Sequence, residues 1–230
     1  MQRLVDQGTH KLNAIVYNEY ICIAICLGMH SNSLIHTMVC FVVNAYFIAL
    51  PFGTLLLYAI ANETTRHGYI AGGMSKNYFK YFYLYGVMLS AILPIQNMYR
   101  VHLYRRLFET VVFKYSPKSR MRPIHFVHGM AYYTCMCLHM HGKAIVHTKV
   151  FMLLNIAHFA AHYCVFIRKQ YIYSHYVLEL MIHMHLWMEI RSMQLFFNLL
   201  YAGVFVGVSI ANREALKHRK HALGKGKEWP

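Results

Sequence analysis

Long apolar segments alternate with short polar connections along the chain, and this pattern predicts helices that cross a membrane. A helix needs about 17 to 25 mostly apolar residues to cross a hydrocarbon layer of about 30 Å, because no water is present there to bond its backbone. The segments that approach this length are Leu34–Ala61, Tyr78–Ile95, Pro123–Met140, Val150–Ile167, Tyr171–Ile190 and Met193–Ile210. A shorter segment, Ala14–Met29, is interrupted by Asn18 and Glu19 and is either a span or an interfacial helix. We predict an all-α, polytopic transmembrane bundle of five to seven spans.

Composition supports this class of protein and excludes others. Of the 230 residues, 57% are apolar or aromatic and only 13% are charged, which excludes a disordered or fibrous chain. The formal net charge is +15, but a basic chain this apolar is not typical of nucleic-acid binding, so we expect no nucleic-acid partner. The six cysteines lie in apolar segments without a CxxC pair, and we expect buried thiols rather than a metal or redox motif.

Basic residues are distributed unevenly around the predicted spans. One predicted connection carries Arg100, Arg105, Arg106, Lys114, Lys118, Arg120 and Arg122. Counting the later spans places Arg168, Lys169 and the basic C-terminal tail on that same face, and the opposite face receives Lys143, Lys149 and Arg191. Positive charge favours the cytoplasmic or matrix side. The basic face is then either a binding surface for anionic phospholipids or an acidic partner, or a consequence of membrane orientation alone.

Polar residues inside three of the predicted spans fall at helical spacing. Glu179 lies near the centre of Tyr171–Ile190, where a lone carboxylate is costly, and His175 and His183 lie four residues to either side of it. The two other polar stripes are Asn155, His158 and His162 on one span and His125, His128 and Tyr132 on another. We expect the three stripes to meet inside the bundle. They would form a hydrogen-bonded polar core, a lipid or cofactor pocket, or a metal or haem site, and we assign no metal ligands.

A family resemblance begins at Tyr99, where the chain runs YRVHLYRRLFETVVFKYSPKSRMRPIHFVHGMAYYT. This stretch resembles the steroid 5-alpha-reductase superfamily, and most closely its trans-2-enoyl-CoA reductase branch. The matching positions are His102, Arg105, Arg106, Leu107, Glu109, Thr110, Met121, Tyr132 and Tyr133. HYVLEL at His175–Leu180 is similar to the family's Asn-Tyr-x-x-Glu box, and KHRKHALGKGKEWP to its closing basic segment. We therefore divide the chain into N-terminal membrane helices, 1–99, without a match, and a reductase-like C-terminal membrane domain with a basic tail, 100–230.

The resemblance implies a helical membrane enzyme that binds NADPH from the basic side. Such an enzyme transfers hydride to a carbon–carbon double bond in an enoyl-CoA, a steroid or a polyprenoid, and it would act in lipid metabolism in the endoplasmic reticulum. It further implies that Arg105, Arg106, Tyr176 and Glu179 contact the cofactor and that Tyr104 is the nearest candidate proton donor. Glu109 has a second interpretation from its spacing alone, an ion pair with Arg105 or Arg106.

Several positions depart from the family pattern. His175 replaces the Asn of the box, and Leu103 stands where steroid reductases carry a catalytic Tyr. Only 12 residues separate His162 from His175, so a functional loop of roughly twenty residues is missing. We therefore predict a shortened, degenerate reductase fold without cofactor. It would be a non-catalytic accessory or structural subunit of a respiratory or ATP-synthase type complex in the mitochondrial inner membrane, with an active reductase as the alternative.

A second, looser resemblance is to fatty-acid elongases. It rests on the segments HFVH, LLNIAH and SMQLFF. The histidine box of elongases reads His-x-x-His-His, whereas His125 and His128 are followed here by Gly129. This resemblance therefore ranks below the reductase family.

Overall fold

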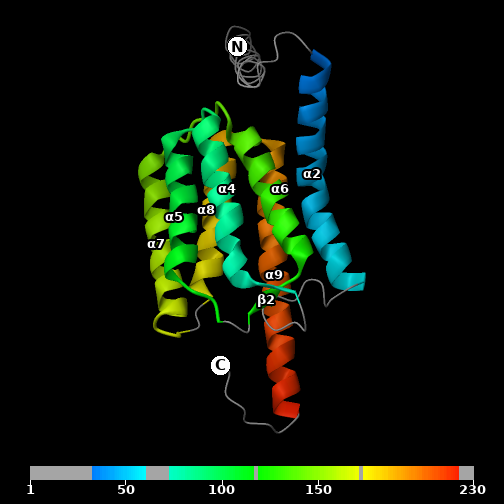
Figure 1. The fold of residues 1–230 in the computed structure, drawn as a ribbon, viewed down its shortest axis with the longest axis vertical. Coiled ribbons are helices and arrows are strands. Elements are labelled where there is room, and N and C mark those ends of the chain that lie inside the picture. The colour runs from blue at the N-terminus through cyan, green and yellow to red at the C-terminus, as the bar shows by residue number, and fades with distance from the viewer. Residues whose placement is uncertain (1–32, 61–72, 117–118, 171–172, 223–230) are drawn as a thin grey trace, which may run out of the picture.

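The structure is a computed structural model that describes residues 33–60, 73–116, 119–170 and 173–222. Within these ranges the chain forms seven α-helices that run side by side as a bundle (Figure 1). The helices are α2 (Ser33–Ile60), α4 (Phe79–Ile92), α5 (Asn97–Val112), α6 (Pro123–Met140), α7 (Thr148–Phe166), α8 (Ser174–Ile190) and α9 (Met193–Ala222). The predicted all-α class is confirmed.

Three of these helices are long and apolar enough to cross a membrane, by length and composition. The qualifying stretches are Thr37–Ile60 in α2, Thr148–Phe166 in α7 and Met193–Ala215 in α9. The sequence pattern predicted each of them to within a few residues at most ends, and it predicted Pro123–Met140 with both bounds of α6. Helix α9 continues well beyond the predicted Ile210. The predicted segment Ala14–Met29 lies outside the described residues.

Helix α5 was not predicted as a helix, and its presence corrects the interpretation of residues 99–122 as one basic connection. Its 16 residues include His102, Glu109 and three arginines, so its hydropathy resembles that of a loop. Arg100 lies at the end where α4 meets α5, and its guanidinium donates to the Leu93 carbonyl at 3.2 Å. Arg105 and Arg106 instead lie inside the bundle, with 10% and 17% of their side chains exposed.

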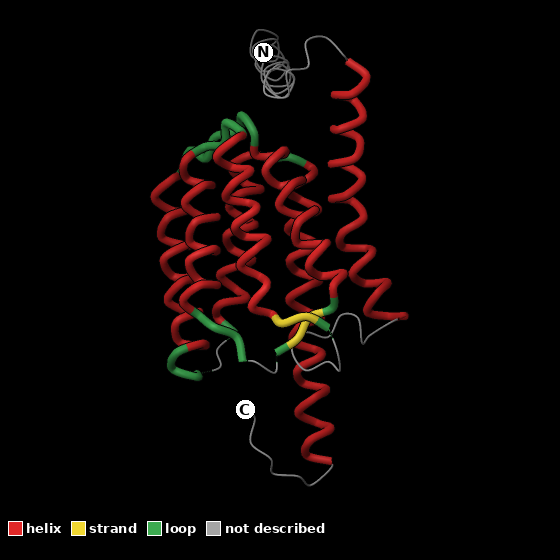
Figure 2. The backbone as a smooth tube through the Cα atoms, in the orientation of Figure 1, coloured by secondary structure: helices red, strands yellow, loops and turns green. Residues whose placement is uncertain are grey.

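A short antiparallel ladder marks one end of the bundle, which we call the hairpin end. Strand β1 (Met74–Ser75) pairs with β2 (Arg120–Met121) there, at the lower end of the bundle in Figure 2. The connections that follow α5 and α7 lie at the same end, and α9 extends past the bundle on this side (Figure 1). Described basic residues near the hairpin end are Lys76, Lys80, Lys114, Arg120, Arg122, Arg168, Lys169 and Arg213; those near the opposite end are Arg100, Lys143, Lys149 and Arg191.

Close packing joins the two regions into which the sequence was divided. The proposed boundary between 1–99 and 100–230 falls inside α5, and α4 packs against both α5 and α6. At this contact, a Cβ added to Gly129 would lie 2.8 Å from the Phe82 ring, and one added to Gly86 would lie 3.0 Å from the Tyr133 ring. Such distances are below normal contact, so glycine is what lets α4 and α6 approach.

Candidate functional site

Charged and polar side chains from α5, α7 and α8 meet in the interior of the bundle. We call this group the charged centre; its members are His102, Arg105, Arg106, Glu109, Asn155, His158, His162 and Glu179. Helical spacing places the members contributed by each helix on one face, three or four residues apart. Placing charges in an apolar bundle is costly unless each is paired, and the contacts below supply those pairs.

Glu109 is the hub of the charged centre. Its carboxylate accepts from Arg105 Nη1 at one oxygen and from Arg106 Nη1 at the other, the latter at 2.9 Å. The side chain is only 3% exposed, so removing it would leave two guanidinium groups without their carboxylate. The predicted pairing of Glu109 with a neighbouring arginine is confirmed, and it involves both arginines.

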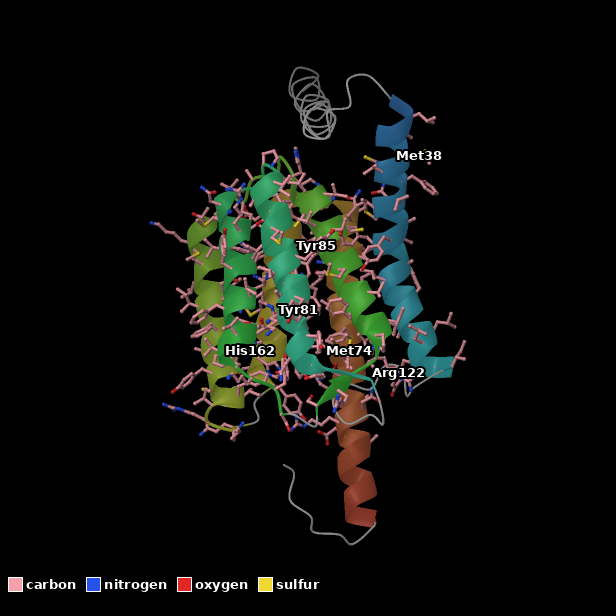
Figure 3. The ribbon with its side chains drawn as sticks, viewed as in Figure 1. Met38, Met74, Tyr81, Tyr85, Arg122 and His162 are labelled. Atoms are coloured by element: carbon pink, nitrogen blue, oxygen red, sulfur yellow. The ribbon has the colours of Figure 1, made fainter. Side chains whose placement is uncertain are left out.

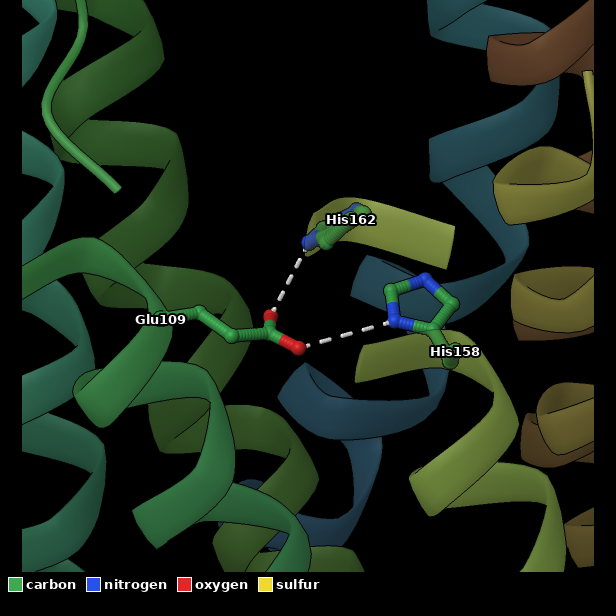
Figure 4. Close-up of side chains that lie close together, drawn as sticks. All are labelled: Glu109, His158 and His162. Carbon is green, nitrogen blue, oxygen red and sulfur yellow. Dashed lines mark ion pairs between the residues drawn. The ribbon is translucent and has the colours of Figure 1, made fainter. Parts of the chain in front are cut away.

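Two histidines of α7 approach Glu109 from the other side (Figure 4). His162 Nδ1 lies 3.2 Å from Glu109 Oε2, and His158 Nδ1 lies 3.8 Å from Glu109 Oε1. Among the described residues, these three offer ligand atoms within 4.8 Å of one another, as a metal site would require. The guanidinium groups of Arg105 and Arg106 already bind the same carboxylate, however, and their positive charge opposes a cation there. The arrangement fits an ion-pair network better than a metal centre.

His158 is held in one tautomer by its neighbours. Arg105 Nη1 lies 2.7 Å from His158 Nδ1, and a guanidinium can only donate, so Nδ1 is the acceptor. The ring proton therefore lies on Nε2, which is 2.7 Å from Glu179 Oε2. His158 is 1% exposed, and its two ring nitrogens bridge Arg105 and the carboxylate of Glu179.

Glu179 also connects the charged centre to α9 and α6. His183 Nε2 lies 3.6 Å from Glu179 Oε1, and Asn198 Nδ2 lies 2.9 Å from His183 Nδ1. The hydroxyl of Tyr132 in turn donates to Asn198 Oδ1 at 3.0 Å. Residues from all three predicted polar stripes are thus joined in one network, which confirms that the stripes meet inside the bundle.

A second polar group contains no formal charge pair and joins α2 to α6 and α9. We call it the tyrosine–histidine cluster; it consists of Tyr46, His128 and Tyr201. His128 Nδ1 lies 3.2 Å from the Tyr46 hydroxyl, and His128 Nε2 lies 2.9 Å from the Tyr201 hydroxyl. Because α2 otherwise meets the bundle mainly along α9, this cluster fixes α2 by directional bonds.

A small pocket opens from the charged centre toward the hairpin end. It is lined by Tyr83, Arg106, Glu109, Thr110, Phe113, Tyr115, His162 and Phe166. Arg106 forms one wall, and its Nη2 donates to the Tyr83 hydroxyl at 2.6 Å. Figure 3 shows His162 on the half of the bundle nearer Met74 and Arg122, which belong to the hairpin end. The pocket therefore lies between the buried charges and the basic face.

Lys76, at the hairpin end, has a lowered pKa because its ammonium group packs against aromatic rings. Lys76 Nζ lies 5.9 Å from the centre of the Phe79 ring and 5.7 Å from that of Tyr115. Burial against these rings lowers the pKa of Lys76 from 10.5 to about 8, because desolvation disfavours the charged form.

The structure gathers most, but not all, of the residues that the resemblance assigned to the cofactor. Arg105, Arg106 and Glu179 lie in the charged centre, and Tyr176 lies one turn before Glu179 on α8, with its ring 3.9 Å from that of His175. Tyr104, the candidate proton donor, is 51% exposed on the outer side of α5. The pattern of polar stripes alone missed Tyr83 and the hub position of Glu109. The helical spacing of Glu109 from both arginines was the available signal.

No family model, curated protein or solved structure matches the chain. The resemblance to the reductase family therefore stays a prediction from residues 99–134 and the shorter C-terminal segments.

Proposed function

We propose that the chain is an integral membrane protein of five to seven spans. Three helices meet the length and hydropathy expected of a span, and α4, α5, α6 and α8 run beside them at similar depth (Figure 1). Apolar side chains cover the outside of α2, where Phe41 is 71% exposed. Lipid is the environment in which such a surface is stable. The basic hairpin end would then face the cytoplasm or matrix and contact anionic phospholipids.

For the activity, we propose an NADPH-dependent reductase of carbon–carbon double bonds in lipid metabolism, acting in the endoplasmic reticulum. The observation that carries this is the charged centre: two arginines, two glutamates and two histidines in mutual contact inside an apolar bundle. A core that only has to hold helices together is as stable, or more stable, with apolar side chains. Ionisable residues inside membrane bundles are rare and commonly mark functional sites.

The pocket supports the same assignment. Arg106 lines it on the side of the basic end, the side from which the resemblance places NADPH. A guanidinium binds phosphate oxygens through two parallel bonds, and the basic residues of the hairpin end raise the local concentration of a polyanionic cofactor. Arg106 and Glu179 are the residues we assign to cofactor binding first, with Arg105 and Tyr176 beside them.

A second candidate function, favoured by a different observation, is a non-catalytic accessory subunit of a respiratory or ATP-synthase type complex in the mitochondrial inner membrane. Both carboxylates and both arginines already have partners within the chain, so the centre needs no cofactor for charge balance. The connection between α7 and α8 is also short. In this case the exposed apolar side of α2 would meet other membrane subunits rather than lipid alone.

The two functions are distinguished by purifying the protein in mild detergent and titrating it with NADPH. For the reductase we expect saturable binding, and NADPH oxidation with an enoyl-CoA, a steroid enone or a polyprenoid. Arg106→Lys keeps the charge but loses the paired N–H donors of the guanidinium, so NADPH binding should weaken about tenfold or more. Arg120→Lys is the matched control, because Arg120 is exposed at the same end.

Native sizing with mass spectrometry completes the experiment. A lone species that binds and oxidises NADPH supports the reductase. Absence of binding and turnover, together with stoichiometric migration in a large complex, would overturn it in favour of the accessory subunit.

A further inference from the structure

Methionine covers the outer side of α8 from the middle of the helix to its end. The exposed large apolar residues within this helix are Val177, Met181, Met184 and Met188, and the three methionines are 40%, 43% and 59% exposed in that order. The corresponding residues within α7 are Val150, Leu153, Ile156 and Tyr163. Because such side chains satisfy lipid contact on a neighbouring helix, contact with lipid alone does not select thioethers on α8.

The three methionines share one side of α8 with His185. They are separated by three and then four residues, so their side chains lie on successive turns of one face. His185 follows Met181 by four residues and precedes Met188 by three, which places it on the same face, at the edge nearer α7. We call these four residues the methionine–histidine group.

His185 is held in place but keeps a nitrogen without a partner. Its ring stacks on that of Phe151 in α7, with ring centres 5.9 Å apart. Its Nε2 is buried and has no hydrogen-bond partner in the described part of the chain, whereas both ring nitrogens of His158 and of His183 contact a partner. A buried polar atom without a partner is uncommon in folded proteins, and a bound ion is one of its physical explanations.

We propose that the methionine–histidine group binds a monovalent copper ion, Cu(I). Thioether sulfur is a soft ligand that selects Cu(I), and imidazole suits copper as well. A methionine side chain has three rotatable bonds and adapts its shape, so sulfurs from one turn before and one turn after can converge on an ion beside Met184 and His185. The site is independent of the reductase and accessory-subunit functions proposed above.

The surroundings suit a soft monovalent ion better than a hard divalent one. All four side chains of the group are neutral as ligands, and both carboxylates of α8 are already engaged elsewhere. Glu179 contacts His158 and His183, and Glu189 accepts from the imidazole and the backbone N–H of His147. Mg²⁺ and Ca²⁺ require oxygen ligands, and Zn²⁺ is held by thiolate, imidazole or carboxylate rather than by thioether. The donor set therefore favours Cu(I).

The position of the group along α8 gives the ion a route from water. Met188 lies two residues before Ile190, the last residue of the helix, at the end of the bundle opposite the hairpin end. That end carries fewer described basic residues than the hairpin end, so it repels a cation less. Copper would reach the group from this side of the membrane.

The test measures Cu(I) binding by the full-length protein, purified in mild detergent without oxygen. Bicinchoninate, a chelator that absorbs visible light when it holds Cu(I), reports how much copper the protein withdraws. We expect one Cu(I) per chain, not displaced by excess Zn²⁺. Replacing the sulfurs with Met181→Leu, Met184→Leu and Met188→Leu together leaves side-chain volume nearly unchanged, and the affinity should fall about 100-fold or more. His185→Leu alone should weaken binding about tenfold.

Matched controls come from methionines that are equally exposed on other helices. Met38 of α2 and Met88 of α4 are 58% and 57% exposed, so Met38→Leu with Met88→Leu removes similar thioethers away from the group. This double variant should retain the wild-type affinity for Cu(I). Thermal unfolding of each variant shows whether its fold is intact.

A second measurement uses the wild-type protein and needs no substitution. Ag(I) has the charge and softness of Cu(I), and in chloride-free buffer it can be added before a short exposure to hydrogen peroxide. Peroxide converts a free thioether to the sulfoxide, whereas a thioether bound to the ion has its lone pair engaged. Peptide mass spectrometry should show loss of sulfoxide at Met181, Met184 and Met188 when Ag(I) is present, and no change at Met38 and Met88.

Each outcome decides the proposal. Copper withdrawn by the wild type and by the control variant but not by the folded triple variant supports the site, as does selective protection by Ag(I). A wild-type protein that takes no Cu(I) from bicinchoninate overturns it. So does a triple variant of unchanged affinity, or equal oxidation of Met181, Met184 and Met188 with and without Ag(I).

Discussion

The charged centre and the tyrosine–histidine cluster both hold three helices together, but the first uses charged groups and the second neutral ones. Each joins three helices inside an apolar bundle through histidine side chains. The tyrosine–histidine cluster does so with neutral groups, so its assembly costs no desolvation of charge. The charged centre places two guanidinium and two carboxylate groups in the same kind of environment, at a penalty of several kcal/mol per ion before pairing.

This difference indicates what the charges are for. Neutral hydrogen bonds suffice to fix a helix, as the attachment of α2 through His128 illustrates. Keeping four charges where neutral groups would serve therefore favours a chemical role at the charged centre. The comparison can be tested by removing charges singly, removing them together, and disrupting the neutral cluster.

The largest effect is expected from Glu109→Gln. The variant leaves both arginines of α5 without their carboxylate, and breaking a buried ion pair on one side costs about 3–5 kcal/mol of unfolding free energy. Thermal or denaturant unfolding in detergent measures it. Glu214→Gln is the control: Glu214 accepts from the Tyr173 hydroxyl at 2.7 Å near the surface and should cost only about 1 kcal/mol. Equal effects of the two variants would contradict the hub position of Glu109.

Removing all four charges together should act in the opposite direction. The variant with Arg105→Met, Arg106→Met, Glu109→Leu and Glu179→Leu keeps the net charge and roughly the volume. We expect it to be as stable as the wild type or more stable by about 1–4 kcal/mol, and to have lost NADPH binding. The same unfolding assay and a cofactor titration check both halves. A strongly destabilised variant would indicate that the charged centre holds the fold rather than serving chemistry.

A smaller loss is expected when the neutral cluster is broken. His128→Leu leaves the hydroxyls of Tyr46 and Tyr201 without their shared partner, at about 1–3 kcal/mol. Tyr201→Phe removes one of the two bonds and should cost about 0.5–1.5 kcal/mol. Neither substitution should change NADPH binding, because the cluster lies at α2 rather than at the pocket. An effect on binding as large as that of Arg106→Lys would remove the distinction between the two regions.

The last effect concerns Lys76, a half-buried cation beside aromatic rings, and it is a pH dependence of stability rather than a loss at one pH. Its pKa is about 8 in the folded protein and 10.5 when unfolded. Between these values the unfolded state holds more protons, so unfolding free energy should rise with pH across this interval and level off on either side. Thermal unfolding at several pH values measures the slope. Lys76→Met should reduce it, whereas Lys80→Met, at an exposed position, should not.

The sequence pattern predicted the apolar helices because hydropathy and length are local properties. Pro123 begins α6 where the pattern placed it, since proline suits the first turn of a helix. Helix α5 was missed for the complementary reason. Its arginines and Glu109 make it look like a loop, and they become tolerable inside the bundle only because they pair with each other and with α7.

The candidate site was also predicted only in part. The sequence indicated which residues share a helix face, and its prediction that three polar stripes meet was confirmed. The contact of Tyr83 with Arg106 depends on α4 packing beside α5, which spacing along the chain does not encode. The exposure of Tyr104 likewise depends on which side of α5 the neighbouring helices cover.

The sequence by itself determined the all-α class, the apolar segments that include the three helices able to cross a membrane, and the polar faces of α6, α7 and α8. Each follows from periodicity within one helix. Only the tertiary structure decided that α5 belongs to the bundle, that Glu109 faces His158 and His162 of α7, and that Arg106 reaches Tyr83. These contacts join residues on different helices or compensate charges across them, and their energy exists only once the helices have packed.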